Sequence, residues 1–201
     1  MINRERIRQD KLLRLRANLA QKPIIAGLKG SADSEKSAQA GIKVCFYLTG
    51  HIFELRELVQ QSKEQGQMVF AHVDLISGVA KDNYGMDMLA SEIGVDGVLT
   101  TKGHLITAAK RAGLLGIHRL FMLDSEALKT GLRMLESSQP DAVEVLPALI
   151  LPSIRERLPG RLPPIIAGGL VETANELRAL LRPPVLAVST SRIELWNYER
   201  E

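Results

Sequence analysis

Short apolar runs recur along this chain roughly every 22 residues, and a stretch with helical periodicity follows most of them. Glycine closes most of the helical stretches, and proline marks two further joints, as is common just past a helix C-terminus. The runs are apolar nearly throughout, which is typical of strands covered on both faces. The runs lie at residues 23–30, 42–48, 67–75, 96–101, 114–123, 141–147, 163–169 and 184–191.

Evenly spaced strand–helix units predict an α/β fold, the (β/α)8 TIM barrel, near the short end of its size range. An open doubly wound sheet is the alternative, but eight even repeats favour closure. Helical periodicity is clear in residues 51–66, 104–113 and 125–138, and Thr173-x-x-Glu176 has the spacing of a capping box. We therefore expect a single barrel domain over residues 23–201.

The first 22 residues differ from the rest of the chain in charge. They hold seven Lys/Arg and two Asp/Glu, whereas the whole chain has a net charge of only +3. Leu12, Leu15 and Leu19 recur at helical spacing. We expect residues 1–22 to form a basic helical extension whose leucine stripe packs on the barrel.

The apolar segments are too short to span a membrane. None approaches the ~18 residues that a spanning helix needs, and the charged N-terminus does not resemble a secretory signal. The one cysteine, Cys45, lies in an apolar run, where a buried structural thiol is expected. These features predict a cytoplasmic protein without a membrane partner.

Two small-residue motifs close the last two predicted strands. Gly168 and Gly169 end the seventh, and Ser189 and Thr190 end the eighth. In this architecture, phosphate sites are commonly built there from backbone amides and short hydroxyls. We predict that these four residues bind a phosphate group; a tight turn without a ligand is the alternative for the glycine pair.

Ionisable residues interrupt otherwise apolar strands. His72 and Asp74 share one face of the third strand, and Glu144 lies within the sixth. Buried charges need partners, and Lys102 or Arg119 could supply them. One interpretation is a structural ion-pair network. The other is a site where Asp74 and Glu144 bind ligand hydroxyls while Lys102 and Arg119 help to neutralise a phosphate.

No arrangement of residues demands catalysis. Metal-ligand motifs and Ser–His–Asp or Cys–His patterns are missing, so we predict no catalytic residue, metal or cofactor. The H-x-D pair is similar to that of metal-binding phosphosugar epimerases, but those carry a further acidic ligand on the glycine-pair strand, which here reads IIAGG. An isomerase or lyase acting on a small sugar phosphate, built around Asp74, Glu144 and Lys102, remains the alternative.

Several motifs together resemble the glycerol-3-phosphate-responsive antiterminator family. They match in order and spacing over about residues 67–198, and more loosely over 23–66. The motifs are HVDLISGVAKDNYG, GVLTTKGHLITAAKRAG, IHRLFMLD, VEVLP, IIAGG and VSTSRIELW.

The resemblance implies a regulator on a (β/α)8 barrel that binds glycerol 3-phosphate as effector. It further implies action on the leader mRNA of glycerol-utilisation genes, so that transcription passes a terminator. Carried over to this chain, Gly168, Gly169, Ser189 and Thr190 would hold the phosphate. Asp74 and Glu144 would face the glycerol hydroxyls, with Lys102 and Arg119 as basic lining groups.

The basic N-terminal helix is the predicted RNA-binding segment. The low aromatic content argues against base stacking, so contacts would be made to phosphates by cationic side chains. The alternative is that this helix only closes the barrel and that its charges are solvated. A third reading is a barrel that keeps the phosphate site, has lost RNA binding and catalysis, and serves as a protein-interaction module. Separately, a homo-oligomer is a possible assembly of the chain. The predicted RNA-binding residues are Arg4, Arg6, Arg8, Lys11, Arg14 and Arg16.

Overall fold

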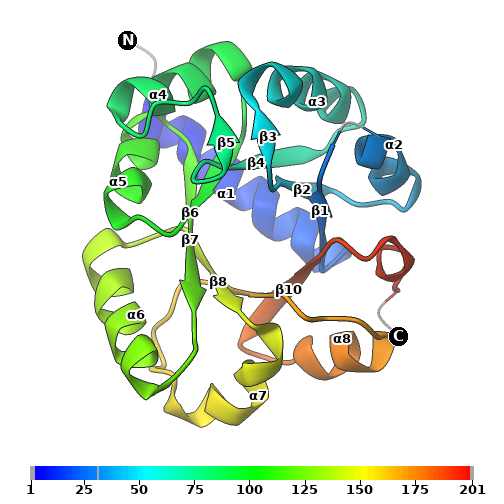
Figure 1. The fold of residues 1–201 in the computed structure, drawn as a ribbon, viewed down its shortest axis with the longest axis vertical. Helices are drawn as coiled ribbons and strands as arrows, with labels where there is room; N and C mark the ends of the chain where they lie inside the picture. Colours follow the sequence, from blue (N-terminus) through cyan, green and yellow to red (C-terminus); the bar gives the residue numbers. More distant parts are fainter. Residues whose placement is uncertain (1–2, 31, 200–201) are drawn as a thin grey trace.

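Eight parallel strands close into a barrel in the computed structural model, which describes residues 3–30 and 32–199 (Figure 1). The order around the barrel is β1-β2-β4-β6-β7-β8-β9-β10, and β10 pairs with β1 to close it. Every barrel strand falls within a predicted run, and the predicted (β/α)8 TIM barrel is confirmed. The strands are β1 (Ile24–Leu28), β2 (Val44–Tyr47), β4 (Met68–His72), β6 (Gly97–Thr100), β7 (Leu115–Phe121), β8 (Ala142–Leu146), β9 (Ile165–Gly168) and β10 (Val185–Thr190).

Helices connect the strands and form the outer layer (Figure 1). The α-helices are α1 (Arg4–Gln21), α2 (Ala32–Gln39), α3 (Ile52–Glu64), α4 (Asn83–Met88), α5 (Gly103–Arg111), α6 (Ser125–Ser138), α7 (Leu151–Ile154) and α8 (Ala174–Leu180). Short helical turns complete the layer in the described part of the chain: η1 (Leu89–Ile93), η2 (Ala148–Ile150), η3 (Arg155–Arg157) and η4 (Ile193–Leu195).

A second, two-stranded sheet was not predicted. It pairs β3 (Gly50–His51) with β5 (Ile76–Ser77) beyond the ends of β2 and β4. Two residues are too few to show a strand period, so the sequence carries no signal for it. His51 lies in β3 and caps α3: its Nδ1 accepts a hydrogen bond from the Glu54 amide at 3.3 Å.

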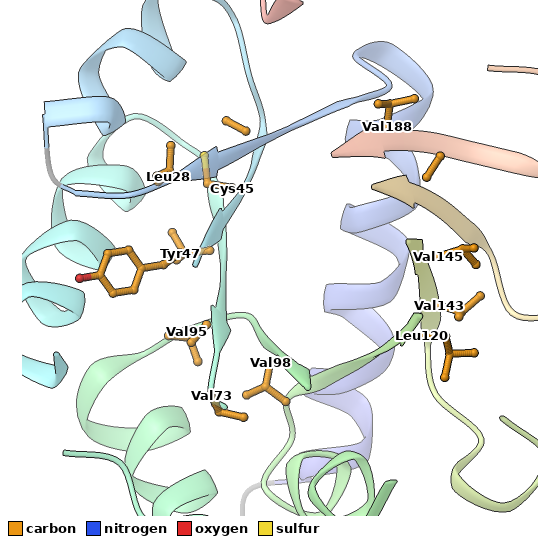
Figure 2. Packing of buried hydrophobic residues seen from close by; sticks show 14 of the residues in the cluster. Leu28, Cys45, Tyr47, Val73, Val95, Val98, Leu120, Val143, Val145 and Val188 are labelled. Carbon is orange, nitrogen blue, oxygen red and sulfur yellow. The ribbon is translucent and has the colours of Figure 1, made fainter. Parts of the chain in front are cut away.

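The barrel separates two apolar cores. The larger one lies between strands and helices, and Figure 2 shows some of its side chains, including Tyr47, Val98 and Val143. The smaller one fills the barrel interior, where the Phe46 and Phe70 rings pack edge to face, 5.8 Å apart. Gly97 makes room for this pair, because a Cβ there would lie 2.5 Å from the Phe70 ring.

Helix α1 completes the interior core at the N-terminal end of the barrel. Leu15 and Leu19 are 2% and 1% exposed and belong to the same cluster as Phe46 and Phe70, with Leu12 packed against it. Figure 1 shows α1 crossing the barrel opening behind the strands. The division into an extension of residues 1–22 and a barrel of 23–201 stays a prediction, although both contribute to one core.

Cationic side chains of α1 bind backbone carbonyls at or just past the C-terminal ends of the neighbouring helices. Lys11 Nζ donates to the Val95 and Gly113 carbonyls, 3.3 Å each, and Arg14 to the Gly66 carbonyl at 2.9 Å. Arg4 donates to the Arg111 carbonyl at 3.3 Å. Helix C-termini carry partial negative charge, so this contact is electrostatically favourable.

Removing the leucine stripe of α1 should destabilise the whole fold. We expect Leu15→Ala to lower the free energy of unfolding by about 2–5 kcal/mol, because it leaves a cavity in the interior core. Leu13→Ala is the matched control; Leu13 is 67% exposed on the same helix, so its effect should stay within about 0.5 kcal/mol. Urea unfolding of both variants measures this. Equal, small losses would show that α1 is not integral to the barrel.

Candidate functional site

Four inward-facing side chains form one hydrogen-bonded chain near the C-terminal ends of the strands. Ser189 Oγ donates to Glu144 Oε1 at 2.5 Å, and Arg119 Nε donates to Glu144 Oε2 at 2.6 Å. Arg119 Nη1 lies 3.4 Å from His72 Nδ1. Each residue comes from a different strand, β10, β8, β7 and β4, so closure of the barrel is what brings them together.

Glu144 is the centre of this chain. Its side chain is 1% exposed, so the carboxylate depends on its two donors, one of them cationic, in place of water. The sequence left open whether Lys102 or Arg119 supplies the partner; the structure places Arg119 there. Lys102 lies at the N-cap of α5 with an exposed side chain.

His72 is uncharged at neutral pH. Burial and then the nearby Arg119 charge lower its pKa to about 4, and the Asp74 charge opposes them only in part. Because arginine can only donate, His72 Nδ1 accepts from Arg119 and the ring proton is on Nε2. His72 Nε2 has no hydrogen-bond partner among the described residues and lies 3.8 Å from Asp74 Oδ2.

Gly168 leaves the space in which Glu144 and Ser189 form their hydrogen bond. A Cβ at this position would lie 2.7 Å from both Glu144 Oε1 and Ser189 Oγ. The following residues, Gly169 and Leu170, both have positive φ, +78° and +61°. The two glycines therefore have different roles. Gly168 leaves room for the Glu144 and Ser189 side chains, and Gly169 adopts a positive φ that other residues disfavour.

A cavity of about 300 Å³ opens beside this chain of side chains. Five of the predicted ligand residues line it: Arg119, Glu144, Gly169, Ser189 and Thr190. Gly168, Asp74 and Lys102 do not line it. The predicted set is thus divided between the cavity and its surroundings, and the ligand roles stay predictions.

Asp74 is held at the end of β6 by three donors. Its carboxylate accepts the Thr100 hydroxyl and the Thr101 amide, both at 2.7 Å, and the Thr101 hydroxyl at 2.9 Å. Burial opposes ionisation of Asp74, but these hydrogen bonds outweigh it and lower the pKa. Lys81, which sequence reasoning missed, binds the Val73 and Ile76 carbonyls nearby.

The start of α8 offers less to an anion than the glycine pair suggested. The capping box at Thr173 is confirmed: Thr173 Oγ1 accepts the Glu176 amide, and Glu176 Oε2 accepts the Glu172 and Thr173 amides. The amides of Glu172, Thr173 and Glu176 around the start of α8 are therefore already paired. A phosphate here would need other donors, such as Thr190, whose Oγ1 accepts the Arg192 amide at 3.1 Å and keeps its own hydrogen to donate.

Sequence reasoning missed several cavity-lining residues. Arg192 and Glu172 are the charged ones, and they form an ion pair of 3.0 Å between the segments that follow β10 and β9. Arg192 directly follows the Ser-Thr-Ser run, which was the available signal. Glu172 had no signal, because its place depends on how the chain turns after Gly169. The other missed lining residues are Gly27, Phe46, Leu48, Leu146, Leu170, Val171 and Ser191.

The predicted RNA-binding residues lie on α1, at the opposite end of the barrel. Arg8 is buried and pairs with Glu5 and Asp141. Arg4 pairs with Asp87 at 2.9 Å and, like Lys11 and Arg14, binds helix-end carbonyls. Arg6 and Arg16 are exposed. The RNA role of these six residues stays a prediction, and four of them have structural partners.

The described residues hold neither a metal-binding cluster nor a membrane-spanning helix. Across residues 3–30 and 32–199, His, Cys, Asp and Glu side chains nowhere gather in threes in a way that could hold a metal ion. Within those same ranges, every helix is too short or too polar to cross a membrane.

Comparison with known proteins decides the family. The family described as "Glycerol-3-phosphate responsive antiterminator" matches residues 24–196. The chain belongs to this family. The Escherichia coli K12 protein YgcP, itself uncharacterised, is 30% identical over 186 residues, which cover 91% of this chain and 96% of that protein.

Two solved structures from the family share the fold. The glycerol uptake operon antiterminator regulatory protein of Listeria monocytogenes is 34% identical with a TM-score of 0.81, covering 88% of this chain and 95% of that one. The antiterminator-related protein of Thermotoga maritima is 33% identical with a TM-score of 0.78, covering 88% and 99%. A KDPG aldolase from Legionella pneumophila, 17% identical with a TM-score of 0.60, shares the fold alone. The antiterminator neighbours thus point to a regulatory protein.

Adding one methyl group at Gly168 should disturb the site's central contact. We expect Gly168→Ala to lower the free energy of unfolding by about 1–3 kcal/mol, because the new Cβ overpacks Glu144 and Ser189. Gly160→Ala is the control, since nothing lies within 4 Å of a Cβ there. Urea unfolding of the two variants gives the comparison. Equal stabilities would mean that Gly168 is not needed for this packing.

Proposed function

We propose that the cavity binds glycerol 3-phosphate and that occupancy controls antitermination on the leader mRNA of glycerol-utilisation genes. The observation that carries this is the Arg119–Glu144–Ser189 chain on the cavity wall. It sets a cation, a carboxylate and a hydroxyl beside one small cavity. A phosphorylated polyol needs that combination: positive charge and donors for the phosphate, and acceptors for hydroxyl groups.

Gly168, Gly169, Ser189 and Thr190 are the proposed phosphate side. The Ser189 hydroxyl donates to Glu144, so Ser189 would contribute through its backbone unless its hydroxyl turns. Thr190 keeps a hydroxyl hydrogen to donate. Gly169 at φ +78° lets the backbone turn closely along the cavity.

Glu144 and Asp74 are the proposed acceptors for the glycerol hydroxyls. A carboxylate has about four lone-pair sites, so Glu144 can accept from a ligand beside its two present donors. Arg119 lines the cavity, while Asp74 and Lys102 lie outside its lining and would reach a ligand only after a side-chain movement.

A regulator requires a difference in ligand affinity between two conformations, not a reaction. No catalytic residue, metal or cofactor is needed, and the effector is glycerol 3-phosphate itself. Because the proposed partner is a nascent transcript, we place the protein in the cytoplasm.

Glycerol 3-phosphate should stabilise the protein against heat, whereas glycerol and inorganic phosphate at equal concentration should do much less. At 100 times the dissociation constant the ligand adds ~2.7 kcal/mol to the free energy of unfolding. Thr190→Val should weaken binding about tenfold through loss of one phosphate donor. The exposed Thr107→Val on α5 should bind as the wild type does. Thermal unfolding and calorimetric titration provide the measurements.

Each contrary result has a distinct meaning. Stabilisation only by ribulose 5-phosphate, with turnover of that compound, would replace the regulator by a sugar-phosphate isomerase or lyase. No response to any of these compounds would exclude the phosphate site.

RNA affinity should depend on the exposed cations of α1. Deleting the helix would open the interior core, so the test uses the full chain with Arg6→Gln and Arg16→Gln together. The logarithm of the association constant falls linearly with the logarithm of the salt concentration. Each lost phosphate contact should make this slope shallower by about 0.7–0.9. The control is Arg56→Gln with Arg133→Gln, two exposed arginines on α3 and α6. Anisotropy titrations with a labelled leader transcript of the glycerol genes measure the slopes; equal slopes would exclude α1 as the RNA-binding segment.

A further inference from the structure

Two cationic side chains line the cavity among the described residues, and each already has an anionic partner. Arg119 pairs with Glu144 at 2.6 Å, and Arg192 pairs with Glu172 at 3.0 Å. All four residues are part of the cavity lining. The formal charges cancel, so a phosphate dianion would enter a site without net positive charge. An anion would therefore be attracted more strongly if one of the two carboxylates released its cation.

The two ion pairs differ in how easily they can separate. Glu144 is 1% exposed and also accepts from Ser189, so breaking its pair would leave a buried charge without its cation. Arg192 and Glu172 are 54% and 62% exposed in their side chains. An exposed ion pair contributes little to stability, because water replaces each partner at low cost.

We infer that Arg192 is a phosphate-binding residue of this cavity and that Glu172 occupies its guanidinium until a phosphorylated ligand displaces it. The position supports this: Arg192 follows the proposed phosphate residues Ser189 and Thr190 along the chain, and its own amide donates to Thr190 Oγ1. The guanidinium can bind two phosphate oxygens at once, a geometry that a carboxylate also satisfies. Glu172 thus acts as an internal competitor for the phosphate.

The exchange requires little backbone movement. The Glu172 amide is fixed by the Glu176 carboxylate at 2.9 Å, and the Arg192 amide by Thr190. Both side chains can turn while their backbones remain held. The freed Glu172 carboxylate would then face solvent, at the same edge of the cavity as the exposed Leu170. This assignment rests on the proposed function, and it adds a residue and a competitor to the ligand site.

Removing the competitor should tighten phosphate binding. We expect Glu172→Gln to lower the dissociation constant for glycerol 3-phosphate, and for inorganic phosphate, by about two- to fivefold. Arg192→Gln should raise it about tenfold or more, and Arg192→Lys should restore part of the loss. The double variant should bind as weakly as Arg192→Gln, because Glu172 acts only through Arg192. Calorimetric titration at fixed salt measures all four.

The control is Glu126→Gln, which removes an equally exposed ion pair with Lys129 and Arg133 on α6. Its affinity should equal that of the wild type. If the wild type binds glycerol 3-phosphate but Glu172→Gln binds no more tightly, the competitor role is wrong and the proposed function stands. Wild-type affinity in Arg192→Gln would overturn the phosphate role of Arg192 in the same way. Failure of the wild type itself to bind would overturn the proposed function and this assignment together.

Discussion

The structure depends on filling the interior of a closed eight-stranded barrel at every level. Apolar side chains fill most of the interior; they include the Phe46–Phe70 pair and Leu15 from α1, which lies at the N-terminal opening. The level nearest the C-terminal opening is polar, and there Glu144 is buried with Arg119 and Ser189 as its donors. Removing a partner from a buried carboxylate strongly destabilises the fold, because the remaining charge is left uncompensated. The site is therefore part of the barrel's packing and not a feature added to its surface.

The direction of the helices explains why the basic residues lie where they do. In a barrel of parallel strands the connecting helices also run parallel, so their negative C-termini gather at the end of the barrel that α1 covers. Lys11 and Arg14 bind carbonyls there, and so does Arg4. These contacts give several cationic residues of α1 a structural role that does not involve RNA. A charge excess read from sequence cannot separate these causes, because a helix-end carbonyl and an RNA phosphate attract the same side chains.

The regular spacing of apolar runs, with glycine or proline between them, was enough to predict the eight barrel strands and the closure of the barrel. Sequence patterns also predicted the capping box at Thr173 and the grouping of Arg119, Glu144, Ser189 and Thr190 near one opening. They failed where position depends on chain path beyond a strand end. Lys102 lies two residues after β6 and is exposed. Glu172, which belongs to no motif, lines the cavity. Strand periodicity reports direction only while the chain stays in the strand.

The glycine pair shows how one motif can have two physical causes. Paired glycines before a helix suggest a phosphate cradle, but a Cβ at Gly168 would lie 2.7 Å from Glu144 Oε1 and Ser189 Oγ. The amides of Glu172 and Thr173, just before α8, are bound by the Glu176 carboxylate. Gly169 has the positive φ that turns the chain into the cavity wall. The pair therefore builds the site chiefly by admitting a buried carboxylate and by placing residues 170–172 at its edge. A phosphate bound there would depend on side-chain cations and the Thr190 hydroxyl more than on a helix terminus. The anion affinity of the site would then depend on whether Arg192 is paired with Glu172 or free to bind the ligand.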